Sequence, residues 1–264
     1  MSERLRVRPL IGANWKMQLT PSQTDRVLAT LLDRVAELTD RDLFVLPAYP
    51  ALAAARDRLA GSGVAWGAQD VHPDDEGAHT GDVSAPMLAD LGCSYVMVGH
   101  TERRRDHGET PDLLAAKVAA VVRWGMTPIV CLGERDPNGA DAALAIVIPD
   151  LERIIGGLDG VPGAGLVVAY EPAWAIGVGS RPAEPAVIGT VQRGIRAFLD
   201  ERGLADGSRV IYGGSVDEHV APSVLAEPGV DGLFVGRASV DPDRFAAIAR
   251  TPLAPAEVRA PARS

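Results

Sequence analysis

The chain has 264 residues, of which 47% are hydrophobic and 23% are charged, and its formal net charge is −9. These fractions are close to the globular average and exclude a disordered or collagen-like chain, and the length suffices to bury a sizeable core. The acidic balance, with no basic stripe interleaved with aromatic residues, argues against a nucleic-acid binder, and the absence of a run of about 18 apolar residues argues against a membrane span.

Short apolar runs typical of β-strands recur along the whole chain. Stretches with helical periodicity lie between them, among them Pro21–Leu38, Pro111–Trp124 and Pro185–Arg202. The first of these helices is preceded by Thr20, a capping residue, and begins with proline. The predicted strands are Leu10–Ala13, Leu43–Leu46, Val64–Ala68, Tyr95–Val98, Ile129–Leu132, Leu166–Tyr170, Val210–Tyr212 and Leu233–Val235.

The strand–helix alternation repeats eight times without a hairpin signal, which predicts an α/β fold with a parallel sheet. Eight such units in roughly 250 residues favour a single closed (β/α)8 barrel over an open, doubly wound sheet. Neither G-x-G-x-x-G after the first strand nor a P-loop is present, which counts against nucleotide binding. We expect one barrel domain over residues 1–251 and a loose tail, rich in Pro, Ala and Arg, over residues 252–264.

The two cysteines, Cys93 and Cys131, lie in apolar surroundings and show no metal-ligand spacing. They are typical of buried free thiols in a reducing compartment. The segment Met1–Pro9 is charged and is not followed by the apolar stretch of a signal peptide. We therefore expect a cytoplasmic protein without a bound metal or cofactor.

In a (β/α)8 barrel, functional residues belong at the C-terminal ends of the strands. The predicted strand ends bring together an ammonium, an imidazole, a carboxylate and two glycine-containing turns whose backbone N–H groups could face an anion. This combination predicts proton abstraction next to a carbonyl in a phosphorylated substrate, with no metal needed. The segments concerned are Asn14–Lys16, Gly99–Arg103, Glu171–Trp174, Gly213–Ser215 and Gly236–Arg237.

The basic residues are strongly biased towards arginine. Of the 26, only Lys16 and Lys117 are lysines, and the other 24 are arginines. A compact ammonium suits some chemistry better than a planar guanidinium, so a surviving lysine is of interest. Lys16, at the end of an apolar strand, is the stronger candidate for a functional role.

Four motifs, in order along the chain, resemble those of the triosephosphate isomerase family. The resemblance covers roughly residues 9 to 250 and implies a TIM barrel. It implies an aldose–ketose isomerase that acts on short-chain sugar phosphates. The motifs are Asn14-Trp15-Lys16-Met17, Gly99-His100-Thr101-Glu102-Arg103-Arg104, Ala169-Tyr170-Glu171-Pro172-Ala173-Trp174-Ala175-Ile176-Gly177 and Tyr212-Gly213-Gly214-Ser215-Val216.

The resemblance implies a role for each matching residue. Glu171 is implied as the base that moves a proton between adjacent carbons, and His100 as a neutral electrophile, the pairing for which this family is known. Lys16 and Asn14 are implied to hold and polarise the substrate, with Glu102 beside Lys16.

The resemblance also implies how substrate and subunits are held. The segment Pro172–Arg181 matches a mobile lid, whose closure would exclude water. The segment Gly77–Asp82 matches a loop that reaches into a neighbouring subunit, which implies a homodimer in which Thr80 contacts the partner's active-site region. The phosphate would be received by backbone N–H groups of Gly177, Ser215, Gly236 and Arg237.

The chain departs from the family pattern close to the substrate. Arg237 stands where the family typically has a second glycine, so its side chain could bind phosphate, face solvent or reshape the pocket. The lid carries Val178 and Ser180 where threonine and lysine are common, and Arg181-Pro182 should stiffen its far hinge.

Three functions remain open at this point. The first is interconversion of dihydroxyacetone phosphate and D-glyceraldehyde 3-phosphate. The second is isomerisation of a four-carbon ketose phosphate of the L-erythrulose 1-phosphate type, as in polyol catabolism, since the departures lie where substrate specificity is set. The third is a catalytically silent barrel that binds a sugar phosphate, against which the intact Asn14, Lys16, His100 and Glu171 argue.

Overall fold

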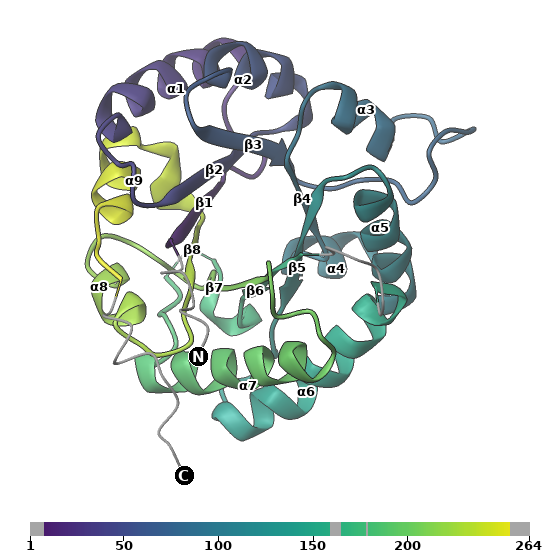
Figure 1. Ribbon diagram of the computed structural model, residues 1–264, viewed down its shortest axis with the longest axis vertical. Coiled ribbons are helices and arrows are strands. Elements are labelled where there is room, and N and C mark those ends of the chain that lie inside the picture. The colour runs from purple at the N-terminus through teal and green to yellow at the C-terminus, as the bar shows by residue number, and fades with distance from the viewer. Residues whose placement is uncertain (1–7, 159–164, 178, 254–264) are drawn as a thin grey trace.

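The computed structural model describes residues 8–158, 165–177 and 179–253. Eight parallel strands form a closed barrel in which each strand pairs with its neighbours in the sequence and β8 pairs with β1 (Figure 1). The predicted α/β barrel is therefore confirmed. The strands are β1 (Leu10–Asn14), β2 (Asp42–Leu46), β3 (Val64–Ala68), β4 (Tyr95–Val98), β5 (Thr127–Leu132), β6 (Val167–Tyr170), β7 (Arg209–Tyr212) and β8 (Gly232–Val235).

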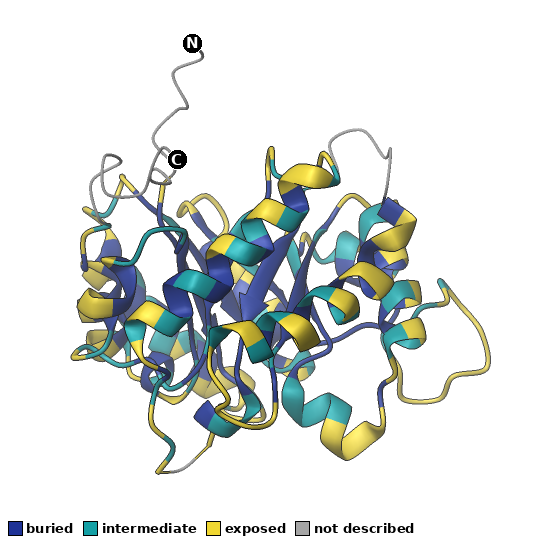
Figure 2. Cartoon of the chain, turned by 90° about the horizontal axis from the view of Figure 1, so that it is seen from below, coloured by how far each residue is buried: buried dark blue, intermediate teal, exposed yellow. Residues whose placement is uncertain are grey.

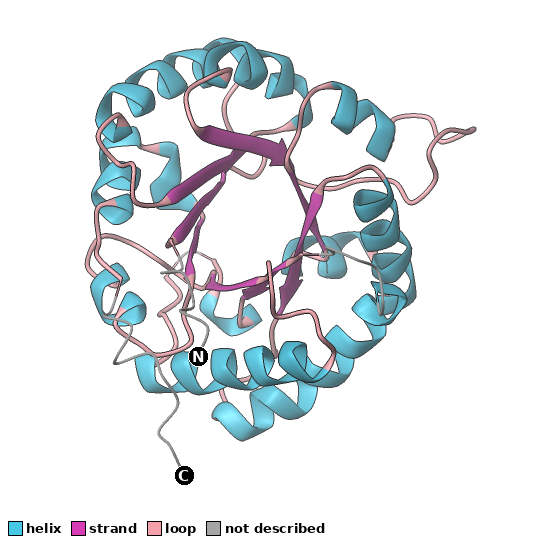
Figure 3. Ribbon diagram, in the orientation of Figure 1, coloured by secondary structure: helices cyan, strands magenta, loops and turns pink. Residues whose placement is uncertain are grey.

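Helices surround the ring of strands, and at least one follows each strand (Figure 3). Four short 3-10 helices also occur in the described residues: Tyr49–Ala51, Gly156–Leu158, Ala173–Ala175 and Arg237–Val240. The α-helices are α1 (Pro21–Val35), α2 (Leu52–Leu59), α3 (Ala85–Asp90), α4 (Thr101–His107), α5 (Pro111–Arg123), α6 (Ala140–Ile155), α7 (Pro185–Glu201), α8 (Ala221–Leu225) and α9 (Pro242–Ala249).

Several predicted boundaries are wrong by one to three residues. In most of the shifted strands the pairing extends beyond the apolar run, because a ladder needs backbone groups and not apolar side chains: Asp42, for example, is in register with Leu10. Strand β6 instead begins one residue later than predicted. The first helix ends at Val35, and Leu38 belongs to a turn in which its N–H donates to the Val35 carbonyl. The predicted start of that helix is correct, since Thr20 forms a complete capping box. The other shifted ends are Asn14, Thr127, Val167, Arg209, Gly232, Arg123 and Glu201.

The core has two layers, one inside the barrel and one between the strands and the helices. In Figure 2 the strands are mostly dark blue, the colour of buried residues. Phe44 lies in the inner layer, where its ring centroid is 4.7 Å from that of Tyr95 and 5.7 Å from that of Phe234. Gly12 leaves the space for this ring, because a Cβ there would lie 2.0 Å from Phe44 Cζ. Burial on both faces explains why the strands are almost continuously apolar.

Both cysteines are buried and free, as expected. Among the described residues, no helix is both long and apolar enough to cross a membrane. Thr251 at the end of the predicted barrel domain is buried, and residues 254–264 of the predicted tail lie outside the described part of the chain.

Candidate active site

The C-terminal ends of the strands surround a cavity of about 490 Å³. The cavity is lined by nine of the ten predicted site residues: Asn14, Lys16, His100, Glu102, Glu171, Gly177, Ser215, Gly236 and Arg237. The barrel therefore gathers residues that are more than 200 positions apart in the sequence. The tenth predicted site residue, Thr80, lies elsewhere, in the exposed loop of residues 76–82.

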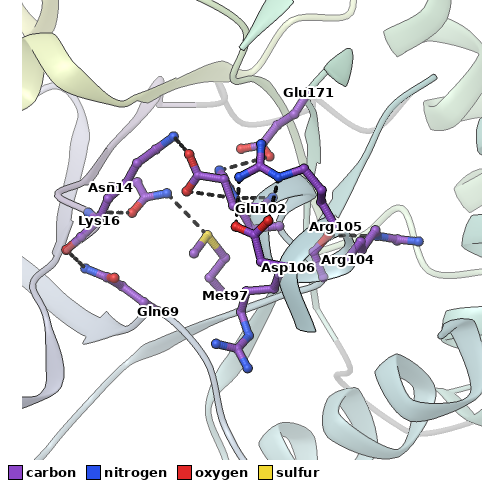
Figure 4. Close-up of polar contacts among 12 residues, drawn as sticks. Asn14, Lys16, Gln69, Met97, Glu102, Arg104, Arg105, Asp106 and Glu171 are labelled. Carbon is purple, nitrogen blue, oxygen red and sulfur yellow. Dashed lines mark hydrogen bonds and ion pairs between the residues drawn. The ribbon is translucent and has the colours of Figure 1, made fainter. Parts of the chain in front are cut away.

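Lys16 adopts a left-handed backbone conformation just after β1, with φ at 50°. Such a conformation costs a non-glycine residue about 1–3 kcal/mol and persists only where neighbours enforce it. Asn14 Oδ1 accepts a hydrogen bond from the Lys16 N–H at 3.0 Å, and Gln69 Nε2 donates to the Lys16 carbonyl at 2.8 Å (Figure 4). The turn is thus held from both sides, and it carries the ammonium into the cavity.

The Lys16 ammonium has one carboxylate partner. Its Nζ lies 2.6 Å from Glu102 Oε1 in a partly exposed pair (Figure 4). The second oxygen of Glu102 lies 3.6 Å from His100 Nδ1. Glu102 thus stands beside Lys16, where the resemblance predicts it.

His100 is buried and caps the N-terminus of α4. Its Nδ1 accepts a hydrogen bond from the Glu102 N–H at 3.1 Å, so the proton of the neutral ring sits on Nε2. Nε2 lies 3.6 Å from Glu171 Oε2. Burial, and then the charge of Lys16, lower the pKa of His100 to about 4. The imidazole is therefore uncharged at neutral pH and directs an N–H towards the carboxylate.

Glu171 follows β6 and is buried, with 3% of its surface exposed. Its Oε2 has no hydrogen-bond partner among the described residues. Burial raises the pKa of Glu171 to about 8, although Lys16 and the thiol of Cys131 oppose the shift. Gly213 makes room for the carboxylate, because a Cβ there would lie 2.7 Å from Glu171 Cγ. Such a carboxylate is a strong base once ionised.

The start of the predicted lid is held by Glu134, a residue that was not among the predicted site residues. The buried Glu134 carboxylate accepts hydrogen bonds from Trp174 Nε1 at 2.8 Å and from the Tyr170 hydroxyl at 3.1 Å. Its backbone carbonyl accepts from the Ala173 N–H at 2.9 Å. No local motif marks Glu134 in the sequence, because its partners lie about 40 residues further along.

The end of the predicted lid is hydrogen-bonded to the loop after β7. Ser180 Oγ lies 2.7 Å from Ser215 Oγ, and the Ser215 hydroxyl also donates to the Ala175 carbonyl at 2.7 Å. The Tyr212 hydroxyl accepts a hydrogen bond from the Ala183 N–H at 2.9 Å. Ser180, one of the departures from the family pattern, therefore contacts a predicted phosphate-binding residue. Val178 lies outside the described residues.

A second charged cluster, the clamp, lies behind α4 and consists of Asp70, Arg103, Glu109 and Lys117. Lys117 Nζ is buried between Asp70 Oδ1 at 2.7 Å and Glu109 Oε1 at 2.6 Å. Arg103 joins the same two carboxylates at 2.8 and 2.7 Å. Since Arg103 is in the first turn of α4, the clamp fixes the helix that carries Glu102 into the cavity.

Arg104 supports the strand ends from outside the barrel. Its guanidinium donates to the Gly99 carbonyl at 2.8 Å and to the Cys131 carbonyl at 3.1 Å, and it pairs with Asp150 at 2.9 Å. By contrast, Arg105 forms an exposed pair with Asp106 (Figure 4). Two adjacent arginines thus differ in role, and only their side-chain contacts distinguish them.

The described residues contain one group of three potential metal ligands, which no ligand spacing in the sequence predicts. The ligand atoms of His72, Asp74 and His79 lie within 4.8 Å of one another, because the loop before α3 folds back on itself. Hydrogen bonds within the loop already engage them: the Asp74 N–H donates to His72 Nδ1, and Asp74 Oδ2 is 3.1 Å from His79 Nε2. None of the three lines the cavity.

The cavity chemistry points to proton transfer. A buried carboxylate with a raised pKa, an uncharged imidazole that directs an N–H towards it, and an ammonium can together move a proton between neighbouring carbons and stabilise the negative oxygen that results. The strand ends of a (β/α)8 barrel are where such enzymes carry their sites. Fold and cavity thus define the class of barrel isomerases.

Comparison with known proteins narrows this class. The family model described as triosephosphate isomerase matches residues 9–251. A triosephosphate isomerase of Thermus thermophilus is 44% identical over 249 residues, covering 92% of this chain and 98% of that protein. One of Halorhodospira halophila is 42% identical over 245 residues, covering 91% and 96%. The crystal structure of triosephosphate isomerase from Bartonella henselae superimposes with a TM-score of 0.82 at 30% identity, covering 92% and 98%. The chain belongs to the triosephosphate isomerase family.

Proposed function

We propose that the chain interconverts dihydroxyacetone phosphate and D-glyceraldehyde 3-phosphate through an enediolate. The observation that carries this proposal is family membership over residues 9–251, together with one cavity that gathers Lys16, His100 and Glu171. The two relatives at 44% and 42% identity are named triosephosphate isomerase, which favours a triose substrate over the four-carbon alternative.

Glu171 acts as the base. In its ionised form the carboxylate takes a proton from the carbon next to the carbonyl, and the electron pair moves onto the carbonyl oxygen to form the enediolate. Returning the proton to the neighbouring carbon completes the isomerisation. Burial keeps the pKa of Glu171 at about 8, so the carboxylate binds the proton firmly and can release it again near neutral pH.

His100 and Lys16 stabilise the intermediate. The Nε2–H of the uncharged imidazole donates to the substrate oxygens, and the ring relays a proton between them. The Lys16 ammonium offsets negative charge on the enediolate and on the phosphate. Asn14 keeps the Lys16 turn in place, and Glu102 holds the ammonium through its carboxylate and the imidazole through its backbone N–H.

The phosphate of the substrate binds to backbone N–H groups in the wall of the cavity. We assign them to Gly177, Ser215, Gly236 and Arg237, all of which line the cavity. The lid, Pro172–Arg181, covers the substrate and excludes water, which protects the enediolate from losing its phosphate.

We further propose that the chain is a homodimer and acts in glycolysis and gluconeogenesis in the cytoplasm. Residues 76–82 are all exposed, and the loop that contains them projects away from the barrel (Figures 1 and 2). Met17, beside the cavity, is 95% exposed, an apolar surface that the loop of a second subunit could cover. Thr80 would then contact the active-site region of the partner subunit, and the buried free thiols Cys93 and Cys131 fit a reducing compartment.

A coupled assay on the purified chain tests the reaction. We expect kcat/KM for glyceraldehyde 3-phosphate of about 10⁷ to 10⁸ M⁻¹s⁻¹, close to the diffusional ceiling. A value lower by orders of magnitude, with robust turnover of erythrulose 1-phosphate, would contradict the triose assignment. Sedimentation equilibrium tests the dimer: we expect a mass near twice 27.7 kDa, and a single subunit mass would contradict it.

A further inference from the structure

The cations that line the cavity differ in whether they are already paired. Lys16 pairs with Glu102 at 2.6 Å, and Arg244 pairs with Glu218 at 2.9 Å. Arg237 also lines the cavity and is exposed, yet it forms no side-chain hydrogen bond or ion pair with any described residue. In the described part of the cavity wall it is the cation without a carboxylate partner.

The backbone around Arg237 is held firmly although its side chain is not. Ser239 Oγ lies 2.6 Å from the Gly236 carbonyl and 3.0 Å from the Val235 carbonyl. Trp15 Nε1 donates to the Ser239 carbonyl at 2.9 Å, which ties the segment to the end of β1. A Cβ on Gly236 would lie 3.9 Å from Lys16 Cε, so the residue before Arg237 is close to the Lys16 side chain. A fixed backbone thus presents an unpaired guanidinium at the wall of the cavity.

The charge distribution around the cavity shows why an unpaired guanidinium there favours binding of an anion. The net charge is −9, and Glu102 and Asp217 also line the cavity, so a phosphate dianion entering it meets negative charge. The charges of Lys16 and Arg244 are shared with carboxylates. An unpaired arginine can bind the dianion without first losing a partner, and its planar fork matches two phosphate oxygens at once.

We propose that the Arg237 side chain is a phosphate-binding group that increases the affinity of the cavity for phosphate monoester dianions. It supplements the backbone N–H groups and is a determinant of specificity for the phosphorylated end of the substrate. This inference rests on the proposed function, which brings the substrate phosphate next to Arg237. Because the contact is remote from the reacting carbons, it acts alike on substrate and transition state and changes KM rather than kcat.

The test uses inorganic phosphate as the probe, because its binding does not depend on catalysis. For Arg237→Gln we expect the inhibition constant and the calorimetric Kd of inorganic phosphate to rise about tenfold, the size expected when a partly exposed charge-assisted pair is lost. KM for glyceraldehyde 3-phosphate should rise by a similar factor, while kcat stays within about twofold. Arg237→Lys should restore part of the affinity, since it returns the charge without the fork.

Arg26→Gln is the matched control. Arg26 is exposed on α1, forms no side-chain hydrogen bond or ion pair with any described residue and does not line the cavity. Its replacement by glutamine makes the same change in net charge. We expect it to leave phosphate affinity and KM unchanged. Both variants remove an exposed side chain, and equal melting temperatures would show that neither disturbs the fold.

The outcomes separate this inference from the proposed function. Equal phosphate affinity for the wild type, Arg237→Gln and Arg26→Gln would overturn the role of Arg237 even in an active isomerase, and so would the absence of measurable phosphate binding to the wild type. Phosphate binding that depends on Arg237, in a chain that does not isomerise the triose phosphate, would uphold the inference and contradict the proposed function.

Discussion

The two lysines of the chain occupy opposite electrostatic situations. Lys16 stands at the cavity with one carboxylate, Glu102, and its side chain is 28% exposed. Lys117 lies in the clamp between two carboxylates, Asp70 and Glu109, and its side chain is 5% exposed. The two clusters are adjacent, because Glu102 and Arg103 are consecutive residues of α4.

The difference explains how one residue type serves two purposes. The ammonium of Lys117 is matched by more negative charge than it carries, and Arg103 balances the remainder, so the clamp has no charge to offer a ligand. The charge of Lys16 is only partly balanced by Glu102. It therefore acts on the cavity, where it lowers the pKa of His100 and opposes the rise in the pKa of Glu171. We infer that the cavity cluster, which consists of Lys16, His100, Glu102 and Glu171, serves catalysis. The clamp serves stability.

The largest expected effect is in the cavity cluster. Glu171→Gln keeps the shape of the side chain and removes the base, so kcat should fall by about 10² to 10⁴-fold, the range for general-base catalysis. The coupled isomerase assay measures it. Circular dichroism should show an unchanged fold, and a variant that keeps most of its activity would remove Glu171 from this role.

The clamp should respond in stability instead. Lys117→Met leaves Asp70 and Glu109 buried side by side with only Arg103 to balance them, which should lower the free energy of unfolding by about 3–5 kcal/mol. Urea denaturation measures this change. A loss below about 1 kcal/mol would show that the clamp is not what holds α4.

The pH dependence sharpens the comparison further. Glu171 must be ionised to act, so kcat/KM should fall about tenfold per pH unit below its pKa of about 8 and level off above it. His100, with a pKa of about 4, should add no second transition between pH 5 and 8. A rate that is flat from pH 6 to 9 would contradict the raised pKa.

The same pKa has a consequence for stability. Because the pKa of Glu171 is higher in the folded than in the unfolded chain, its protonated form stabilises the fold fully below the unfolded value, and this contribution is lost as the pH rises through about 8. Glu171→Gln removes the effect. Thermal unfolding should therefore find the variant more stable than the wild type at pH 9, with a smaller difference at pH 5.

The smallest expected effect concerns the lid. Ser180→Ala removes a hydroxyl that lies 2.7 Å from Ser215 Oγ and 2.9 Å from the Gly177 carbonyl, so kcat/KM should fall about three- to tenfold, as for the loss of a net hydrogen bond of about 1 kcal/mol. Thr30→Ala is the control, since its hydroxyl also donates to a backbone carbonyl, on α1. Equal activity of both variants would remove Ser180 from the lid contact.

The barrel and most of the cavity could be predicted from the sequence because they follow from periodicity and from strand ends. Asn14, Lys16, His100 and Glu171 each stand within three residues of the end of an apolar run, where a (β/α)8 barrel brings side chains together. The strands themselves could be recognised because β-strands covered on both faces are nearly all apolar, but such strands do not fix which residues pair with which.

What could not be predicted depends on contacts between distant segments. Glu134 acquires its role only from Tyr170 and Trp174, and Lys117 only from Asp70 and Glu109. Helix α6 contains Pro149, which by local rules should end a helix, yet the helix continues from Ala140 to Ile155 because its apolar face packs on the barrel. The roles of Glu134 and Lys117 and the length of α6 thus all depend on tertiary contacts.

One pair of variants tests the central claim, that the two lysines divide catalysis and stability between them. For Lys16→Met we expect kcat/KM to fall by at least about 10²-fold, the usual cost of losing a charge-stabilising group, while the free energy of unfolding changes little. Lys117→Met, measured alongside, should show the reverse pattern. Its free energy of unfolding should fall, while kcat per folded molecule stays near that of the wild type. If activity and stability fell together in both variants, the division between cavity and clamp would be wrong.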